Sequence, residues 1–301
     1  MKEIKTLDLK FFGIDGMIAS FLAPAGEGFV LFESGPASSA EALEERVGEA
    51  GYGLDDLRAV FVTHVHLDHA GGAGVLARQT GCAVFAHPAG AEHLVDPGAK
   101  LLPSAERLYG DMMAPLWGTT LGVPQDQLRV VGDRDRVMVD GLEVRAWHTP
   151  GHAVHHVAWQ VGGAVITGDV AGVRFPGATH VLPPMPPPDI DIEIWRKSLA
   201  TLRELGSERL LLTHFGEFDD ATRHLDELDA RIVRWAEIAQ RVVAEGGDPK
   251  VLASELESID EHEIEAAAVP PEAVLRYRRL CPMDGNSAGL FRYCSIQAKR
   301  S

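Results

Sequence analysis

Apolar runs and helix-like patterns alternate along the first third of the chain. Short apolar runs bounded by glycine and polar residues predict strands, and windows with apolar positions on one face predict helices. The predicted strands cover 29–32, 59–63 and 82–86, and the predicted helices cover 38–50 and 72–80. The run at 59–63 is continuous, which is typical of a strand buried on both faces. This β-α-β-α-β order predicts an α/β fold in which helices pack on a sheet.

The pattern changes between residues 88 and 168. Residues 88–127 contain five prolines and interrupt the alternation, so we expect an inserted segment with one or two short helices. Beyond it, apolar stretches are separated by Asp140-Gly141 and Gly162-Gly163, pairs that favour two-residue hairpin turns. They predict four strands, at 136–139, 142–147, 154–161 and 164–167.

The last part of the chain is predicted to be largely helical. A proline-rich loop at 173–190 precedes a helix at 192–205, with Asp189 or Asp191 as its cap, and a last buried strand at 210–213. Apolar positions at helical spacing from Leu225 to Val242 predict one long amphipathic helix. Shorter helices are expected at 249–258, 260–267 and 271–280.

Composition narrows the classes of partner. The chain has 28 Lys and Arg against 44 Asp and Glu, a net charge of -16, which disfavours nucleic acid as a partner. No apolar run approaches the ~20 residues that span a bilayer, so we expect no membrane insertion. The cysteines at 82, 281 and 294 form no close pair, and the first residues contain no apolar leader, so a cytoplasmic location is expected.

Four metal-binding side chains fall within six residues, directly after the strand predicted at 59–63. They are His64, His66, Asp68 and His69, followed by Gly71-Gly72. Residues two apart on an extended chain point the same way, so His64 and His66 can bind one ion. Asp68 and His69 lie in the turn that follows and can face a second ion. A surface histidine cluster without function is the alternative, but this spacing at a strand end rarely arises by chance.

Three further candidate ligands end predicted strands. His152 follows the Thr149-Pro150-Gly151 turn, Asp169 ends the strand at 164–167, and His214 ends the strand at 210–213. Strand ends are where open α/β sheets present ligands. A single histidine at such a place is more often structural, and the argument therefore rests on all three together with the first motif.

These motifs resemble those of the metallo-β-lactamase fold superfamily. The resemblance implies an αββα sandwich over residues 1–220, with 88–127 as an insertion or lid, and a helical C-terminal region at 221–301 packed on it. It implies that His64, His66 and His152 hold one metal, that Asp68, His69 and His214 hold the other, and that Asp169 bridges them. Two divalent ions are expected, with zinc first and iron or manganese as alternatives. Imidazole ligands also need carboxylates or backbone carbonyls behind them to fix their tautomers.

Within the superfamily the pattern is most similar to glyoxalase II, to lactonases and to a prokaryotic branch without assigned substrates. This resemblance implies a hydrolase in which a metal-bridging hydroxide cleaves a small thioester, ester or lactone, with Asp68 as a catalytic residue that orients the nucleophile or relays a proton. One alternative is a persulfide dioxygenase-like oxidoreductase with one iron held by His64, His152 and Asp169. An RNA-processing nuclease is a third, which the charge disfavours. The expected partner is a small molecule, and the helical tail leaves a homodimer open.

Several other side chains have no assigned role. At most one of His155 and His156 should face the site, because neighbours in a strand point to opposite sides. His148 is expected to be structural and His180 exposed. Tyr109, Met112, Met113 and Trp117 form either an apolar lid or a core cover, and Arg174 binds either a substrate carboxylate or a nearby acid.

Overall fold

The computed structural model describes residues 3–300, which form two compact units. The first unit contains the residues up to 148 together with 155–168. The second contains Thr149–Val154 and the chain from Asp169 onward. The predicted boundary at residue 220 remains a prediction.

The first unit is built on a mixed six-stranded sheet. Its strands lie in chain order: β1 (Lys5–Asp8), β2 (Ala19–Ala25), β3 (Gly28–Phe32), β4 (Leu57–Phe61), β5 (Ala83–Ala86) and β6 (Leu128–Val130). The pairs β1–β2 and β2–β3 are antiparallel, whereas β3 to β6 run parallel. The parallel part is the predicted β-α-β-α-β region, and β6 was not predicted from the sequence.

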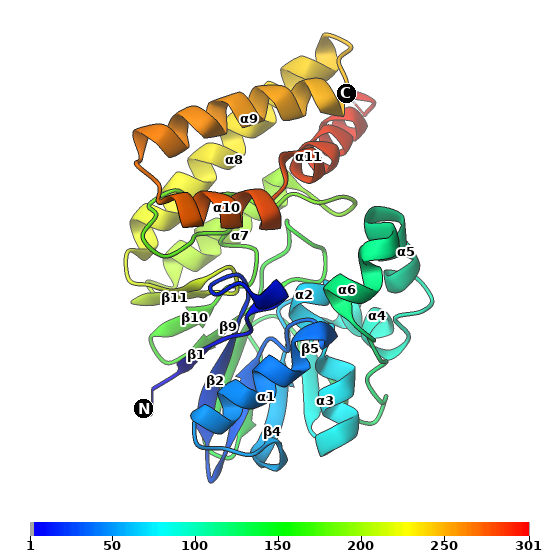
Figure 1. Ribbon diagram of the computed structural model, residues 1–301, viewed down its shortest axis with the longest axis vertical. Coiled ribbons are helices and arrows are strands. Elements are labelled where there is room, and N and C mark those ends of the chain that lie inside the picture. The colour runs from blue at the N-terminus through cyan, green and yellow to red at the C-terminus, as the bar shows by residue number, and fades with distance from the viewer. Residues whose placement is uncertain (1–2, 301) are drawn as a thin grey trace. The chain divides into compact units, whose positions relative to one another are not determined.

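Helices of the first unit connect these strands. They are α1 (Ala40–Glu49), α2 (Leu67–Ala70), α3 (Ala73–Thr80), α4 (Ala91–Val95), α5 (Leu101–Tyr109) and α6 (Met113–Trp117) (Figure 1). The insertion thus holds three short α-helices rather than one or two. Pro103 and Pro115 lie in the first turns of α5 and α6, where a missing N–H costs no helical hydrogen bond.

A second, antiparallel sheet completes the first unit. It contains β7 (Arg136–Val139), β8 (Leu142–His148), β9 (Val157–Val161) and β10 (Ala164–Ile166). The turn between β7 and β8 is the predicted one, with positive φ angles of 44° at Asp140 and 85° at Gly141. β9 begins three residues later than predicted.

Aromatic packing joins the two sheets just before the histidine motif. Phe32, Phe61 and Phe85 are register partners on β3, β4 and β5, and their rings stack with centroids 5.1 and 4.7 Å apart. The ring of Trp159 on β9 contacts Phe61 edge-on at 5.0 Å, and its indole nitrogen donates to the Val62 carbonyl at 3.1 Å. The side chains of Phe32, Phe61 and Trp159 are fully buried, and that of Phe85 is partly buried. This core therefore fixes the backbone from which Thr63 and His64 project.

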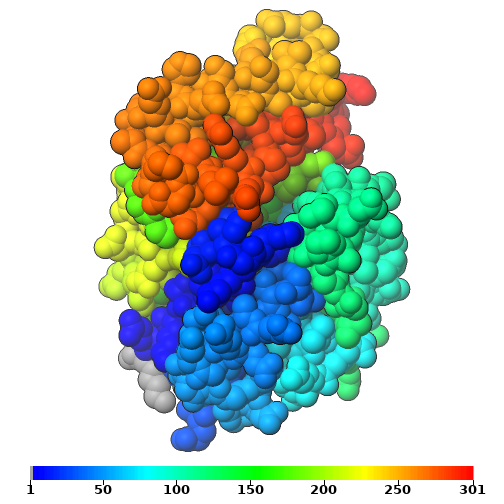
Figure 2. All heavy atoms as spheres, viewed as in Figure 1, coloured from blue at the N-terminus to red at the C-terminus, as the bar shows by residue number. Residues whose placement is uncertain are grey.

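The N-terminal segment covers part of the insertion. It lies beside the insertion, blue next to green in Figure 2, and the ring of Phe11 stacks on Trp117 of α6 at 5.7 Å. Trp117 is buried, so this residue covers the core.

The second unit is mainly helical. It contains α7 (Ile192–Glu204), β11 (Arg209–Leu212), β12 (Gly216–Phe218), α8 (Ala221–Ala244), α9 (Pro249–Ala266), α10 (Pro271–Leu280) and α11 (Met283–Ala298). The Asp191 side chain caps α7 by accepting from the Ile194 N–H at 3.0 Å. α8 is the predicted long amphipathic helix, and α9 and α11 pack along it (Figure 1). Over residues 3–300, the structure has no helix that combines the length and the apolar character needed to cross a membrane.

Candidate metal centre

The first unit brings the four residues of the histidine motif together. The chain leaves β4 at Phe61 and enters α2 at Leu67, so His64 and His66 lie in the connection and Asp68 and His69 in the first helical turn. The Nε2 atom of His64 is 2.9 Å from Nδ1 of His66, and the rings of His64 and His69 are 4.1 Å apart. Nε2 of His69 is 3.7 Å from the Asp68 carboxylate. His64 and His66 thus lie side by side, and their binding of one ion stays a prediction.

A buried carboxylate at the end of β3 orients this motif. Glu33 Oε1 accepts a hydrogen bond from the Thr63 hydroxyl at 2.5 Å and lies 2.9 Å from His69 Nδ1. Its other oxygen accepts from the Thr63 N–H at 3.1 Å. Thr63 Oγ1 is in turn 3.0 Å from His64 Nδ1. Since a carboxylate can only accept, His69 carries its proton on Nδ1 and presents Nε2.

Glu33 was not predicted from the sequence. It lies 30 residues before Thr63, and only the parallel pairing of β3 with β4 brings the two together. Its place at a strand end, at the same sheet edge as His64, is the signal that could have found it.

The second unit brings the other three predicted ligands together. His152 lies in the 149–154 segment, Asp169 begins the long stretch of this unit, and His214 follows β11. One oxygen of Asp169 is 3.4 Å from Nε2 of His152, and the other is 3.4 Å from Nε2 of His214. His152 Nδ1 donates to the Pro184 carbonyl at 2.9 Å, so the proton is on Nδ1 and the lone pair is on Nε2. The groups behind the imidazoles are thus a carboxylate and a backbone carbonyl, as expected, and the Thr63 hydroxyl, which was not expected.

The chemistry of both clusters fits divalent metal ions. Each unit offers imidazole nitrogens and carboxylate oxygens, the ligands that zinc, iron and manganese accept. Acceptors hold the Nδ1 atoms of His69 and His152, so the Nε2 atoms of both rings face the clusters. The side chains present could therefore hold metal.

Comparison with known proteins decides the family. The model of the metallo-beta-lactamase superfamily matches residues 13–214. The chain belongs to this superfamily. The matched stretch contains all seven predicted ligands.

Relatives of known sequence agree with this assignment. The metallo-beta-lactamase fold-containing protein ST1585 of Sulfurisphaera tokodaii is 32% identical over 165 residues, 54% of this chain and 62% of that protein. A hydroxyacylglutathione hydrolase of Tolumonas auensis is 32% identical over 117 residues, 38% of this chain and 34% of that enzyme. The chain thus spans less than two thirds of the length of these relatives.

Solved structures show the fold. The metallo-beta-lactamase family protein TTHA1429 of Thermus thermophilus superposes with a TM-score of 0.69 and 20% identity over 100% of this chain and 94% of its own. The crystal structure of ST1585 gives 0.62 and 23% identity over 78% and 94%. The predicted superfamily fold, with two sheets and a helical C-terminal region, is confirmed.

Two further histidines of this superfamily member lie against the motif. The ring of His156 is 5.0 Å from that of His64, and the ring of His155 is 6.2 Å from His64 and 6.1 Å from His66. The expectation that only one of them faces the motif was wrong. It assumed a strand from residue 154, whereas β9 begins at Val157 and the preceding residues form a turn.

The inserted helices place a tyrosine near Asp68. Partial burial and the negative charge of Asp68 raise the pKa of Tyr109 to about 12. Its phenol therefore stays protonated at neutral pH. Tyr109 packs edge-on against Trp117 at 5.1 Å, and both Tyr109 and Met112 are exposed. Trp117 is thus a core residue, and Tyr109 and Met112 have the exposure that a lid requires.

The remaining candidates have structural partners. The ring of His148 donates to the Val131 carbonyl at 3.0 Å, as expected of a structural histidine. Arg174 pairs with Asp220 at 2.6 Å, which favours its structural alternative. His180 was expected to be exposed but is 2% exposed and lies 2.7 Å from Asp260. Position in a proline-rich loop is therefore a poor guide to exposure here, because helices α8 to α10 cover that loop.

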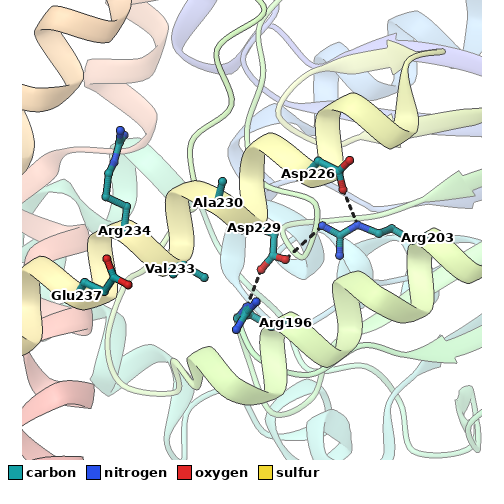
Figure 3. Close-up of a pocket in the computed structure, with 8 residues that line it drawn as sticks. All are labelled: Arg196, Arg203, Asp226, Asp229, Ala230, Val233, Arg234 and Glu237. Carbon is teal, nitrogen blue, oxygen red and sulfur yellow. Dashed lines mark hydrogen bonds and ion pairs between the residues drawn. The ribbon is translucent and has the colours of Figure 1, made fainter.

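A surface groove of about 480 Å³ lies between α7 and α8 (Figure 3). Its charged side chains pair across it, with Arg196 2.8 Å from Asp229 and Arg203 2.9 Å from Asp226. None of the seven predicted ligands lines it. The lining residues are Arg196, Arg203, Asp226, Asp229, Ala230, Val233, Arg234 and Glu237.

Proposed function

We propose that this chain is a metal-dependent hydrolase with two divalent ions that cleaves a small thioester, ester or lactone. The superfamily pattern assigns one ion to His64, His66 and His152, the other to Asp68, His69 and His214, and the bridge to Asp169.

The placement of Asp169 carries the proposal. Each of its two oxygens is 3.4 Å from a different imidazole nitrogen, a long distance for a hydrogen bond. Two ligand atoms about 2.1 Å from one tetrahedral ion lie about 3.4 Å apart. The carboxylate is therefore spaced as a metal ligand beside both His152 and His214, and it would hold metal together with them.

The chain's own residues prepare this site. Glu33 and the Pro184 carbonyl hold His69 and His152 with Nε2 presented. Divalent ions bound there would lower the pKa of a coordinated water and supply hydroxide at neutral pH. Asp68 can orient that nucleophile or accept its proton, and Tyr109 can donate a hydrogen bond to a substrate oxygen.

Two observations support an acyl compound as the substrate. One relative is named a hydroxyacylglutathione hydrolase, which favours a thioester, although the match covers 38% of this chain. The net charge of -16 disfavours a nucleic acid substrate. Zinc is the proposed metal, and a cytoplasmic location remains a prediction.

Metal content and turnover test the proposal together. Protein purified without added metal should contain about two ions per chain and hydrolyse a hydroxyacyl thioester, an aryl ester or a γ-lactone faster than chelator-treated protein does. Near-zero metal, with no activity after zinc, manganese or iron is added, would overturn it. One iron per chain with oxygen uptake on glutathione persulfide would instead establish the oxidoreductase alternative.

A further inference from the structure

One peptide group of the proline-rich loop is held from both sides. The carbonyl of Pro184 accepts the hydrogen bond from His152 Nδ1 at 2.9 Å. The N–H of Met185, which belongs to the same planar peptide, donates to Oδ1 of Asn286 at 2.8 Å. A hydrogen-bond chain therefore runs from Asn286 on α11 through this peptide to His152.

The sequence of the loop makes this contact specific. Residues 183–188 read PPMPPP, and proline has no backbone N–H. Met185 is thus the single residue of this run that can donate a backbone hydrogen bond. Oδ1 of Asn286 accepts that bond. Asn286 therefore pairs with the one backbone N–H that residues 183–188 contain.

Helix α11 is shaped to approach this peptide. Gly289 lies one turn after Asn286, on the same face of the helix. A Cβ atom at Gly289 would lie 2.0 Å from the Met185 carbonyl oxygen, so only glycine permits the observed contact. Asn286 is 3% exposed, and its amide nitrogen has no hydrogen-bond partner among residues 3–300. Among residues 3–300, the side chain of Asn286 therefore makes one hydrogen bond, the one to Met185.

The start of the same loop is also held by the C-terminal helices. His180 is 2.7 Å from Asp260 on α9, and its carbonyl accepts a hydrogen bond from the Tyr277 hydroxyl on α10. Val173 and Leu182 pair through two backbone hydrogen bonds of 2.8 and 2.9 Å. These contacts therefore fix the position of the loop just before residues 183–185.

We propose that Asn286 is a positioning residue for the metal ligand His152. It acts through the Pro184–Met185 peptide, whose carbonyl fixes the tautomer and the ring orientation of His152, so that Nε2 points to Asp169 at 3.4 Å. Hydrogen bonds in such a chain polarise one another, so loss of the bond to Asn286 weakens the one to His152. The inference rests on the proposed function in taking His152 as a metal ligand.

Three variants separate positioning from a general effect on folding. Asn286→Leu removes the acceptor and keeps a side chain branched at the same carbon, and Asn286→Asp keeps an acceptor oxygen. Ser287→Ala is the matched control, because Ser287 is a buried neighbour on α11 whose hydroxyl has no partner among residues 3–300. The readouts are zinc affinity by chelator competition, the absorption spectrum of the cobalt form, and the NMR signal of the His152 Nδ1 proton in metal-free protein.

We expect Asn286→Leu to lower zinc affinity about 10- to 100-fold, to alter the cobalt spectrum and to shift or broaden the His152 signal. Asn286→Asp should recover most of the affinity, and Ser287→Ala should match the wild type. Wild-type affinity together with an unchanged His152 signal in Asn286→Leu would overturn the inference. If Asn286→Leu does not fold, Gly289→Ala displaces the same peptide, and wild-type affinity and signal in that variant would overturn it equally.

Failure of the proposed function would look different. A wild-type protein that binds no metal would overturn the function, while the His152 signal of metal-free Asn286→Leu would still show whether Asn286 controls the ring.

Discussion

At the scale of single residues, Glu33 orients the side chains around it, although nothing in the neighbouring sequence indicates this role. Its carboxylate accepts from the Thr63 N–H, the Thr63 hydroxyl and His69. Glu33→Gln keeps the size but replaces one acceptor oxygen by a donor. We expect zinc affinity to fall about 10- to 100-fold, measured by chelator competition.

Glu27→Gln is the control for this change, because Glu27 is an exposed glutamate in the turn before β3. It should bind zinc like the wild type. Equal affinity in both variants would show that Glu33 does not orient the ligands.

The proposed bridging role of Asp169 makes an equally direct prediction. Asp169→Ala removes both oxygens that face His152 and His214, so turnover should fall at least about 1,000-fold and bound metal should fall below two ions per chain. Elemental analysis and initial rates measure the two effects. Asp219→Ala, at an exposed aspartate in the same unit, should leave both unchanged. A variant at Asp169 with full rate and both ions would show that another group bridges.

Sequence spacing was sufficient to pick out the motif at 64–69 but not the groups behind it. His64 and His66 are predictable because two-residue spacing is a local property of the chain. Glu33 and the Pro184 carbonyl are not, since each depends on which distant segments become neighbours. The exposure predicted for His180 was wrong for the same reason, because the partners of its side chain lie on helices 51 and 80 residues away.

At the scale of elements, the strands were predicted best and the C-terminal helices least well. Continuous apolar runs located β3, β4 and β11, whose burial is imposed by parallel or central positions. The break expected near residue 259 was wrong, because 249–266 form one helix, α9, without an internal glycine or proline after its first residue. α11 was missed since Gly285 and Gly289 lower its helix propensity, and the reason for Gly289 is a contact with the loop.

The buried ionic network between the proline-rich loop and α8–α9 should contribute strongly to stability. Arg231 lies 3.2 Å from His180 and 2.7 Å from Glu263, and burial lowers its pKa. Asp260→Ala removes the partner of His180 and one acceptor of Arg231, so we expect the free energy of unfolding to fall by about 3 kcal/mol. Urea denaturation measures it.

Glu261→Ala is the matched control on the same helix. Glu261 pairs with Arg278 at 3.2 Å at the surface, with more than half of each side chain exposed, so its loss should cost less than about 1 kcal/mol. Equal effects of the two variants would contradict a special role for the buried network.

The start of α8 should make stability depend on pH. Burial alone would raise the pKa of Asp220, but hydrogen bonds and charges from Arg174 and Arg223 outweigh it and lower the pKa to about 2. A lowered folded-state pKa stabilises the protein above the unfolded value near 4, and this contribution is lost as the pH falls from about 4 to 2. Asp220→Asn should therefore be less stable by about 1 kcal/mol at pH 7, after allowance for solvent screening. The difference should vanish near pH 2, and a constant difference in urea denaturation at pH 7 and pH 3 would contradict the assignment.

At the scale of the whole molecule, the proposed ligands are divided between the two units. The first unit supplies His64, His66, Asp68 and His69, and the second supplies His152, Asp169 and His214. If both sets bind the same ions, metal binding stabilises the state in which both units are folded. The two units should then unfold together. Zinc at 100 times its dissociation constant should then raise the free energy of unfolding by about 2.7 kcal/mol.

Hydrogen exchange can follow the two units separately under these conditions. Added zinc should slow exchange in β4 and β9 of the first unit and in β11 and α7 of the second, because opening either unit would release the ions. His66→Ala changes the first unit alone, yet it should also reduce zinc-dependent protection in the second. Ser38→Ala, outside the predicted ligands in the first unit, should leave the zinc effect intact. Protection confined to the unit that keeps its own ligands would mean that each cluster binds metal by itself, and the shared dinuclear site would be wrong.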